Sequence, residues 1–452
     1  MEELQISKEK LVKIRDIIIF ALLFLWMVMP ILQCIISVYK IVNLEEIYFG
    51  LMKTIGVVGI GFATITIFDR IKNAESKKSA IKDLLPIFIF VLYMIWTLIA
   101  CLNSRYKRTA FYGNYYRQEG YYMYINYAGY FLCAFLLKNE KLRKTLFNTF
   151  IISSLFLVIM SRVTLSGERF EKFFTNLEIE KTVFAHFNHY GYFLMMTSIC
   201  SLGLFITEKN KVLKVLYLIA FTIISSALIY NDTFGCFLAV SVILILYAIY
   251  SIIKKKDIKW IFTAITIFMV LSCFITKDGE NLAYKNVKKF ANDITIVFCK
   301  ITGTELKSPE GEKIEGEELE KEFKKVGTQR MTLWKYGIQF MLEKPLLGYG
   351  PDNLGPLYKE LNAQQDRPHN LLIQLATTSG IPAMLLYVTA VGIIIIKGII
   401  KLFKNEKGKI VLLIVTTYLI SAMFGNSMFY TSPYFFIALG SLMKSNLEKE
   451  EQ

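Results

Sequence analysis

Long apolar runs, separated by short charged segments, repeat along almost the whole chain. A helix needs roughly 20 apolar residues to cross the hydrocarbon core of a bilayer, and about twelve runs approach that length. The pattern predicts membrane spans at residues 14–39, 48–69, 84–103, 120–137, 144–162, 187–207, 212–230, 233–253, 258–276, 370–397, 409–428 and 430–445. Inside the run that begins at 370, the stretch "TTSGIP" predicts a break into a short helix and a spanning one, because glycine and proline interrupt helices.

Composition agrees with this pattern. The chain has 452 residues, of which 54% are hydrophobic, and its mean hydropathy is +0.44, too apolar for a soluble protein of this length. We therefore expect an all-α integral membrane protein of about twelve transmembrane helices. The first apolar run is too long for the core of a signal peptide and lacks a small-residue cleavage site, so we expect it to be retained. The seven cysteines are scattered without C-x-x-C spacing, which argues against a disulfide framework or a zinc site.

Lysine and arginine cluster in alternate loops, which predicts the orientation of the chain. The basic loops read "SKEKLVKIR", "RIKNAESKKSAIK", "KNEKLRK", "EKNKVLK", "KKKDIK" and "KLFKNEKGK". If these loops face the cytoplasm, the protein is a multi-pass protein of the cell membrane with both termini inside. The net charge of +15 is then an orientation signal and an attraction to anionic membrane lipid, and it requires no nucleic acid.

The same reading divides the chain into three parts. Residues 1–275 form an N-terminal membrane bundle of about nine helices, residues 276–369 form a large extracytoplasmic loop before the antepenultimate span, and residues 370–452 form the C-terminal membrane helices. No internal repeat of the kind that builds many transporters is evident.

Three shorter outer segments carry polar residues. The segment 104–124, "SRYKRTAFYGNYYRQEGYYMY", holds Arg105, Lys107, Arg108 and Arg117. These cations suit a lipid phosphate or diphosphate, or else outer-leaflet head groups. The segment 161–193 holds Arg162, Arg169, His186, Asn188 and His189, where helix capping by a histidine or asparagine competes with a functional role and no zinc spacing is present. The third segment holds Asn231, Asp232 and Thr233, for which a helix N-cap is the favoured interpretation.

The fourth outer segment, 276–369, has a charged centre that we expect to be solvated and partly helical. An amphipathic stretch follows, in which Met331, Trp334 and Ile338 recur at helical spacing, and we expect it to lie along the outer membrane surface. A passage rich in glycine and proline then leads to Arg367 and His369.

An ordered series of motifs in this region carries a resemblance. R-x-x-x-W at 330–334, "PLLGYG" at 345–350 and "HNLLIQLATTSGIP" at 369–382 resemble the O-antigen ligase and Wzy-type polymerase superfamily, which are polytopic glycosyltransferases of the GT-C class. The close match covers residues 328–400, and "GNYYRQEG" and "FNHYGYF" in the first half are weaker family positions. Many members have a Ser/Thr-Arg pair where this chain reads "NDTFGCFLA", so the work of that arginine would pass to Arg117, Arg162 or Arg169.

The resemblance implies transfer of a glycan from an undecaprenyl-diphosphate donor to a glycan or other hydroxyl acceptor outside the cytoplasmic membrane, with inversion and without a cofactor. In this chemistry His369 is the candidate base. Arginine suits the diphosphate because its planar fork binds phosphate oxygens, and no carboxylate cluster that would hold a metal ion is evident in the sequence. The candidate diphosphate-binding residues are Arg330, Arg367, Arg117 and Arg169, and the candidate supporting residues are Asn370, Trp334 and Asn188.

Other functions remain open at this stage. Within the enzyme class, a repeat-unit polymerase is favoured over a ligase, because the composition, rich in lysine and isoleucine, is typical of an A·T-rich genome of a Gram-positive type, whose envelope has no lipopolysaccharide core. A polysaccharide transporter or flippase is the alternative, opposed by the long outer loop and by the scarcity of charges deep within most spans. A non-catalytic assembly protein is the third.

Overall fold

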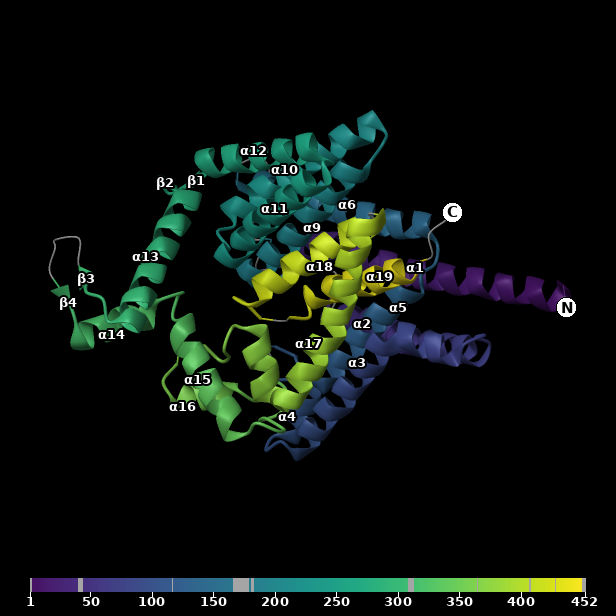
Figure 1. Ribbon diagram of the computed structural model, residues 1–452, viewed down its shortest axis with the longest axis horizontal. Coiled ribbons are helices and arrows are strands. Elements are labelled where there is room, and N and C mark those ends of the chain that lie inside the picture. The colour runs from purple at the N-terminus through teal and green to yellow at the C-terminus, as the bar shows by residue number, and fades with distance from the viewer. Residues whose placement is uncertain are drawn as a thin grey trace.

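The fold is a bundle of long helices from which a smaller helical arm projects at one end (Figure 1). The computed structural model describes residues 2–39, 44–115, 117–165, 179, 183–307, 313–363, 365–405, 408–426 and 428–448. A helix lies at each of the twelve predicted stretches. These helices are α1 (Glu2–Tyr39), α2 (Leu44–Lys72), α3 (Lys77–Asn103), α5 (Tyr121–Leu136), α6 (Glu140–Leu165), α9 (Phe187–Thr207), α10 (Lys211–Tyr230), α11 (Phe234–Lys254), α12 (Ile258–Phe274), α17 (Leu371–Asn405), α18 (Lys409–Ala422) and α19 (Ser432–Leu447).

Eight of these helices are long and apolar enough to cross a membrane, among the residues that the structure describes. They are α1, α2, α3, α6, α9, α10, α11 and α17. Two shorter apolar helices are α12 and α18. The predicted class, an all-α membrane protein, is thereby confirmed. The number of spans, about twelve, stays a prediction.

The centre of the bundle is helix α5, which packs closely against α2 and α19. A Cβ atom placed on Gly59 of α2 would lie 2.2 Å from the carbonyl oxygen of Gly129 in α5, so the two backbones touch where neither residue has a side chain. Small residues allow such close approach between helices in membranes, where packing rather than water drives association. Helix α9 is similarly enclosed, with almost all of its residues buried.

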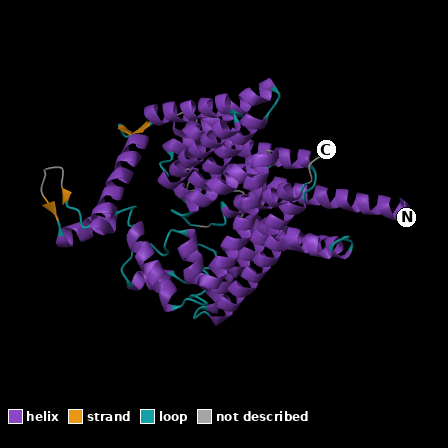
Figure 2. Ribbon diagram, viewed as in Figure 1, coloured by secondary structure: helices purple, strands orange, loops and turns teal. Residues whose placement is uncertain are grey.

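The segment between α12 and α17 has two parts (Figure 2). It contains the short strands β1 (Thr276–Lys277) with β2 (Glu280–Asn281), and β3 (Leu306–Lys307) with β4 (Lys313–Ile314), each pair antiparallel. Its helices are α13 (Leu282–Thr302), α14 (Gly316–Lys325), α15 (Arg330–Glu343) and α16 (Gly355–Glu360). The part from β1 to α14 forms the projecting arm, and the part from α15 to the start of α17 forms a compact lobe. The prediction of a partly helical segment is confirmed, and the two small hairpins were not foreseen.

Helix α17 is broken where the sequence predicted a break. Gly380 has a φ of +87° inside an otherwise helical run, and Pro382 follows it. The break leaves backbone carbonyls free to accept other hydrogen bonds. Thr377 O accepts from Tyr349 N at 3.0 Å, and Thr378 O accepts from Gly350 N at 2.8 Å. The "PLLGYG" segment is therefore docked on the "TTSGIP" break.

The basic loops gather at one end of the bundle. Ion pairs join them across helices: Arg143 to Glu448 at 2.6 Å, Lys144 to Glu208 at 2.6 Å and Lys409 to Asp257 at 2.7 Å. The two ends of the described chain also lie at this end, on the right of Figure 1, whereas the lobe and arm lie on the left. The bundle thus has a basic end and a lobe end.

Candidate functional site

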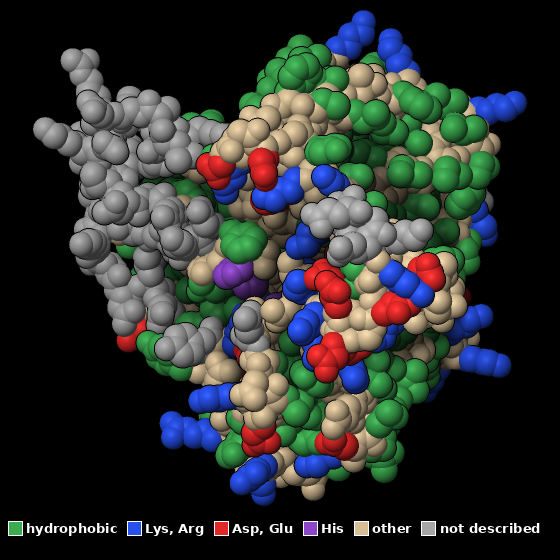
Figure 3. All heavy atoms as spheres, turned by 90° about the vertical axis from the view of Figure 1, so that its left-hand side faces the viewer, with side chains coloured by type: hydrophobic (Ala, Val, Ile, Leu, Met, Phe, Trp, Pro, Cys, Tyr) green, Lys and Arg blue, Asp and Glu red, His purple; other side chains and the backbone are tan. Residues whose placement is uncertain are grey.

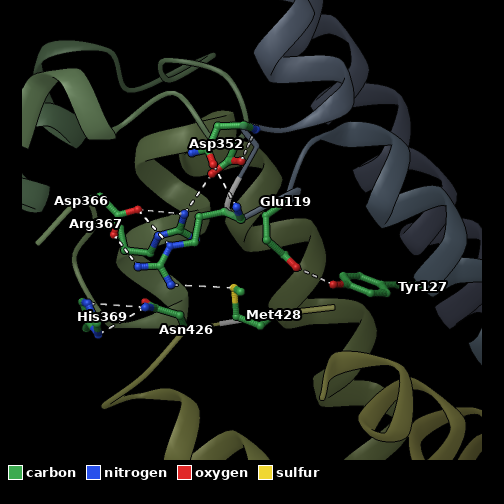
Figure 4. A network of polar contacts seen from close by, with 10 residues as sticks. Glu119, Tyr127, Asp352, Asp366, Arg367, His369, Asn426 and Met428 are labelled. Carbon is green, nitrogen blue, oxygen red and sulfur yellow. Dashed lines mark hydrogen bonds and ion pairs between the residues drawn. The ribbon is translucent and has the colours of Figure 1, made fainter. Parts of the chain in front are cut away.

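The lobe end brings together residues from four separate parts of the chain. Arg117 comes from the segment between α4 (Lys107–Tyr112) and α5. Asp352 and Asp366 come from the lobe, His369 lies two residues before α17, and Asn426 lies in the connection between α18 and α19. Figure 4 shows these side chains converging on one region.

Two arginines in this site are held by two aspartates. The Arg117 guanidinium donates through Nε and Nη2 to the two carboxylate oxygens of Asp366, both at 3.1 Å. Arg367 Nη2 donates to Asp352 Oδ1 at 2.9 Å and to Asp366 Oδ2 at 3.3 Å. Asp366 therefore bridges the two guanidinium groups.

The inner pair is deeply buried. The side chain of Arg367 is 4% exposed and that of Asp352 is 1% exposed. The second oxygen of Asp352 accepts the backbone N–H of Asn114 at 2.7 Å, which ties the lobe to the segment before α5. Arg367 retains a buried Nε and Nη1 without a hydrogen-bond partner among the described residues.

Electrostatics differ between the two aspartates. Burial raises the pKa of Asp352, and Arg367 opposes this rise. Burial also acts on Asp366, but Arg367 and Arg117 outweigh it and lower the pKa of Asp366 to about 2. Asp366 is therefore an anion at any physiological pH.

A third carboxyl group lies behind this pair. Glu119 is fully buried and accepts a hydrogen bond from Tyr127 Oη at 2.5 Å. Burial, opposed in part by that hydrogen bond and by Arg367, raises the pKa of Glu119 to about 7. Its other oxygen, Oε2, is buried without a partner among the described residues.

His369 occupies an unusual backbone conformation at the mouth of α17. Its φ of +52° lies in the left-handed region, which costs a residue other than glycine on the order of 1–3 kcal/mol. The side-chain amide nitrogen of Asn426 lies 3.3 Å from His369 Nδ1 and 3.5 Å from Nε2. Burial, and after it the charge of Arg330, lower the pKa of His369 to about 3. The imidazole is therefore neutral at physiological pH.

Arg330 lies near His369 and differs from the other two arginines. It is the first residue of α15, and its Nη1 donates to Gly327 O at 3.0 Å and to Thr328 Oγ1 at 2.8 Å. Its Nε is buried without a partner, and none of the ion pairs among the described residues includes Arg330. Within the described part of the chain, no side-chain hydrogen bond caps the N-terminus of α15. A cation at that positive end of a helix is unfavourable unless an anion is bound there.

Two of the candidate supporting residues, Asn370 and Trp334, lie next to the connection between α18 and α19. Asn370 caps α17: its Oδ1 accepts from Leu372 N at 3.0 Å and from Ile373 N at 3.1 Å, while its Nδ2 donates to Met423 O at 3.1 Å. Trp334 is half-buried and its ring faces Phe424 at 6.2 Å, on the same connection that carries Asn426.

His186, Asn188 and His189 lie at the N-terminus of α9. His186 caps α9 by accepting from Asn188 N at 3.1 Å, so the capping interpretation is confirmed for the histidine. The rings of His186 and His189 are 5.9 Å apart, and His189 lies within electrostatic range of Arg117 and His369. Figure 3 shows histidine side chains in a recess at this end. Arg169 lies outside the described residues, as does the side chain of Arg162.

The third outer segment does not use the predicted side-chain cap. Thr233 occupies the N-cap position of α11, but its Oγ1 accepts from Asn231 Nδ2 at 2.7 Å instead of from the helix. Asp232 has a φ of +55° and accepts from Asn286 in α13 at 2.7 Å. These residues join the bundle to the arm.

Sequence reasoning missed Asp352, Asp366, Glu119 and Asn426. Three carboxylates, those of Asp352, Asp366 and Glu119, lie around Arg117 and Arg367. The signal that was available is physical: a buried arginine needs a counter-charge, and Asp366 directly precedes Arg367. No group of three or more His, Cys, Asp or Glu suited to a metal ion occurs within the part of the chain that the structure describes.

The fold and site define a class: a helical membrane protein with a buried network of arginine and carboxylate at one end, and a neutral histidine near an arginine that pairs with no described carboxylate. A family model described as O-antigen ligase matches residues 218–388, which include α15, the docked lobe and His369. The match confirms the resemblance to the O-antigen ligase family that the motifs predicted. With the apolar helices, the match supports a membrane enzyme that processes glycans. No curated protein matches the chain.

Proposed function

We propose that this protein is a glycosyltransferase that uses an undecaprenyl-diphosphate-linked glycan as donor and acts outside the cytoplasmic membrane, with polymerisation of repeat units favoured over ligation to a different acceptor. The observation that carries the proposal is the proximity of neutral His369 to Arg330, a half-buried cation that has no carboxylate partner among the described residues. One group can accept a proton and the other can bind a phosphate, within one site.

Arg330 is the principal diphosphate-binding residue in this proposal. Arg117 and Arg367 are matched by Asp366 and Asp352, so Arg330 supplies the uncompensated positive charge. The N-terminus of α15 adds to it, because helix N-termini bind anions. Arg367 keeps two unpartnered donor atoms and can contribute hydrogen bonds, while its charge is largely offset.

His369 is the general base. The acceptor hydroxyl oxygen attacks the anomeric carbon as the bond from that carbon to the diphosphate oxygen breaks, and the hydroxyl proton passes to the imidazole. The bonding electron pair leaves with the lipid diphosphate, where Arg330 stabilises the developing charge. Attack from the face opposite the leaving group inverts the anomeric centre, and no cofactor enters this step.

Binding of the donor also strengthens the base. Burial, and after it the charge of Arg330, lower the pKa of His369 in the free protein. A diphosphate bound to Arg330 offsets the charge of Arg330 and raises the pKa of the imidazole, which makes the imidazole a better proton acceptor.

The orientation belongs to the same proposal. The basic end faces the cytoplasm, with both termini, and the lobe end faces outward, following the distribution of lysine and arginine. The N-terminal bundle (1–275), the outer segment (276–369) and the C-terminal helices (370–452) are then three parts around one site.

Reconstitution with a defined donor tests the proposal. The purified protein in liposomes receives an undecaprenyl-diphosphate-linked repeat unit, and the products are separated by length. A ladder of longer glycans on lipid diphosphate is the expected result. A single transfer product on an added acceptor would assign a ligase instead, and movement of the donor between leaflets without new bonds would assign a flippase.

A further inference from the structure

A cavity lies at the basic end of the bundle, at the opposite end from His369. It has a volume of about 350 Å³, is open on one side, and is lined by residues of α1, α2, α3, α5 and α19 and by Lys138. Volumes of roughly 300–1,000 Å³ are typical of small-molecule sites. Nothing in the proposed glycosyl transfer uses this cavity.

The polar wall of the cavity is cationic. Arg15, Arg70, Lys138 and Lys444 line it, and Asp69 is the carboxylate that accompanies them. Arg15 forms an ion pair with Asp16 at 2.7 Å, and Arg70 forms one with Asp83 at 2.8 Å. Four cations therefore face three carboxylates, and the excess charge belongs to the lysines.

Lys444 is the more buried of the two lysines. It is half-buried, and no ion pair among the described residues includes it. Arg70, Lys138 and Arg143 lie within electrostatic range and repel it. Glu448 attracts it, but that carboxylate is already paired with Arg143 at 2.6 Å. An anion in the cavity would relieve this repulsion.

The rest of the wall is apolar. Ile67, Leu84, Phe135, Leu136 and Leu447 line the cavity beside the cations. A free inorganic anion would gain nothing from these side chains, whereas a phospholipid can place its phosphate on the lysines and its acyl chains along the apolar wall. Basic pockets between membrane helices on the cytoplasmic side bind anionic lipid head groups in this way.

We propose that this cavity binds the phosphodiester head group of an anionic phospholipid, with Lys138 and Lys444 as the phosphate-binding residues. Arg15 is a structural element of the wall, because Asp16, Thr66 and the carbonyl of Leu136 already take its donors. The bound lipid joins α5 to α19 at the basic end.

The test uses the full chain in detergent after lipid has been removed. The protein is titrated with phosphatidylglycerol, phosphatidylcholine or inorganic phosphate. Its melting temperature is measured at each step, and bound lipid is measured by native mass spectrometry. The variant is Lys138→Gln with Lys444→Gln. Its matched control is Lys209→Gln with Lys211→Gln, which removes the same charge from exposed positions at the same end.

Phosphatidylglycerol should stabilise the wild type and the control more than phosphatidylcholine does. The cavity variant should bind it roughly fivefold more weakly for each lysine removed, about 25-fold for both. Equal binding by the cavity variant and the control would overturn the proposal, as would equal stabilisation by phosphatidylcholine. Stabilisation by inorganic phosphate alone would reject a lipid as the ligand. If the double variant fails to fold, exposed Lys138→Gln alone must still show the fivefold loss.

Discussion

Arg330 and Arg367 lie in different surroundings, so replacing each with alanine should change the stability of the protein by different amounts. Arg367→Ala leaves Asp352 buried without its cation, which costs roughly 3–5 kcal/mol. Arg330→Ala removes a cation with no carboxylate partner among the described residues and should leave the melting temperature nearly unchanged. Thermal unfolding in detergent measures both, and Asp352→Ala added to Arg367→Ala should restore part of the loss. Equal destabilisation by the two single substitutions would contradict this distinction.

Glu119 should make stability depend on pH. Its pKa is about 7 in the folded protein, above the ordinary value of 4.5, because it is fully buried. The folded state therefore favours the protonated form: this contribution is fully present below about pH 4.5 and is lost as pH rises through 7, by roughly 3 kcal/mol in all. Wild type should melt at a lower temperature at pH 8 than at pH 5. Glu119→Gln should remove this difference, and an unchanged pH dependence in that variant would assign it to other groups.

Activity should survive removal of divalent metal ions. The carboxylates of the site are engaged by arginines, so they are not available as a set of metal ligands. Purified enzyme assayed in EDTA should keep its rate. Loss of turnover that Mg²⁺ or Mn²⁺ restores would exclude arginine as the sole source of charge for the diphosphate.

At the scale of elements, the break in α17 holds the site together. A Cβ atom on Gly380 would lie 1.9 Å from the carbonyl oxygen of Leu346, and the φ of +87° there disfavours any other residue. Gly380→Ala should therefore displace the "PLLGYG" segment, which precedes Asp352, and lower both melting temperature and glycosyl transfer. Gly392→Ala is the control, since nothing lies within 4 Å of its added Cβ. Equal behaviour of the two variants would mean that the break does not position the site.

The elements themselves were largely predictable, because apolar runs of membrane length leave few alternatives to helix. The break at Gly380 was also predictable, since glycine and proline act locally. The partners of the site were not predictable. Asp366 meets Arg117 across 249 residues of chain, and Asn426 meets His369 across 57 residues, so both contacts form only when distant segments fold together. The motif residues were found by their order along the chain, which carries no information on which arginine is already paired.

At the scale of the whole molecule, the basic end and the lobe end should face opposite sides of the membrane. A single cysteine at Glu317, an exposed position in α14, should react with a reagent that cannot cross the membrane when it is added to intact cells. The background protein needs Cys273→Ser, because Cys273 is exposed and the other six cysteines are buried. Labelling only by a reagent that crosses the membrane would mean that the lobe end faces the cytoplasm, and it would contradict a site outside the cytoplasmic membrane.

The central claim is that His369 acts in chemistry and Arg330 acts in both donor binding and chemistry. Donor affinity and turnover are measured together in liposomes with an undecaprenyl-diphosphate-linked glycan, for wild type, His369→Ala and Arg330→Ala at equal amounts of folded protein. His369→Ala should bind donor normally and lose turnover by about 10²–10⁴-fold, the contribution of a general base. Arg330→Ala should lose both, with partial recovery in Arg330→Lys, because a point charge replaces only part of the guanidinium fork. Near-normal product from His369→Ala, or unchanged donor affinity in Arg330→Ala, would contradict the account.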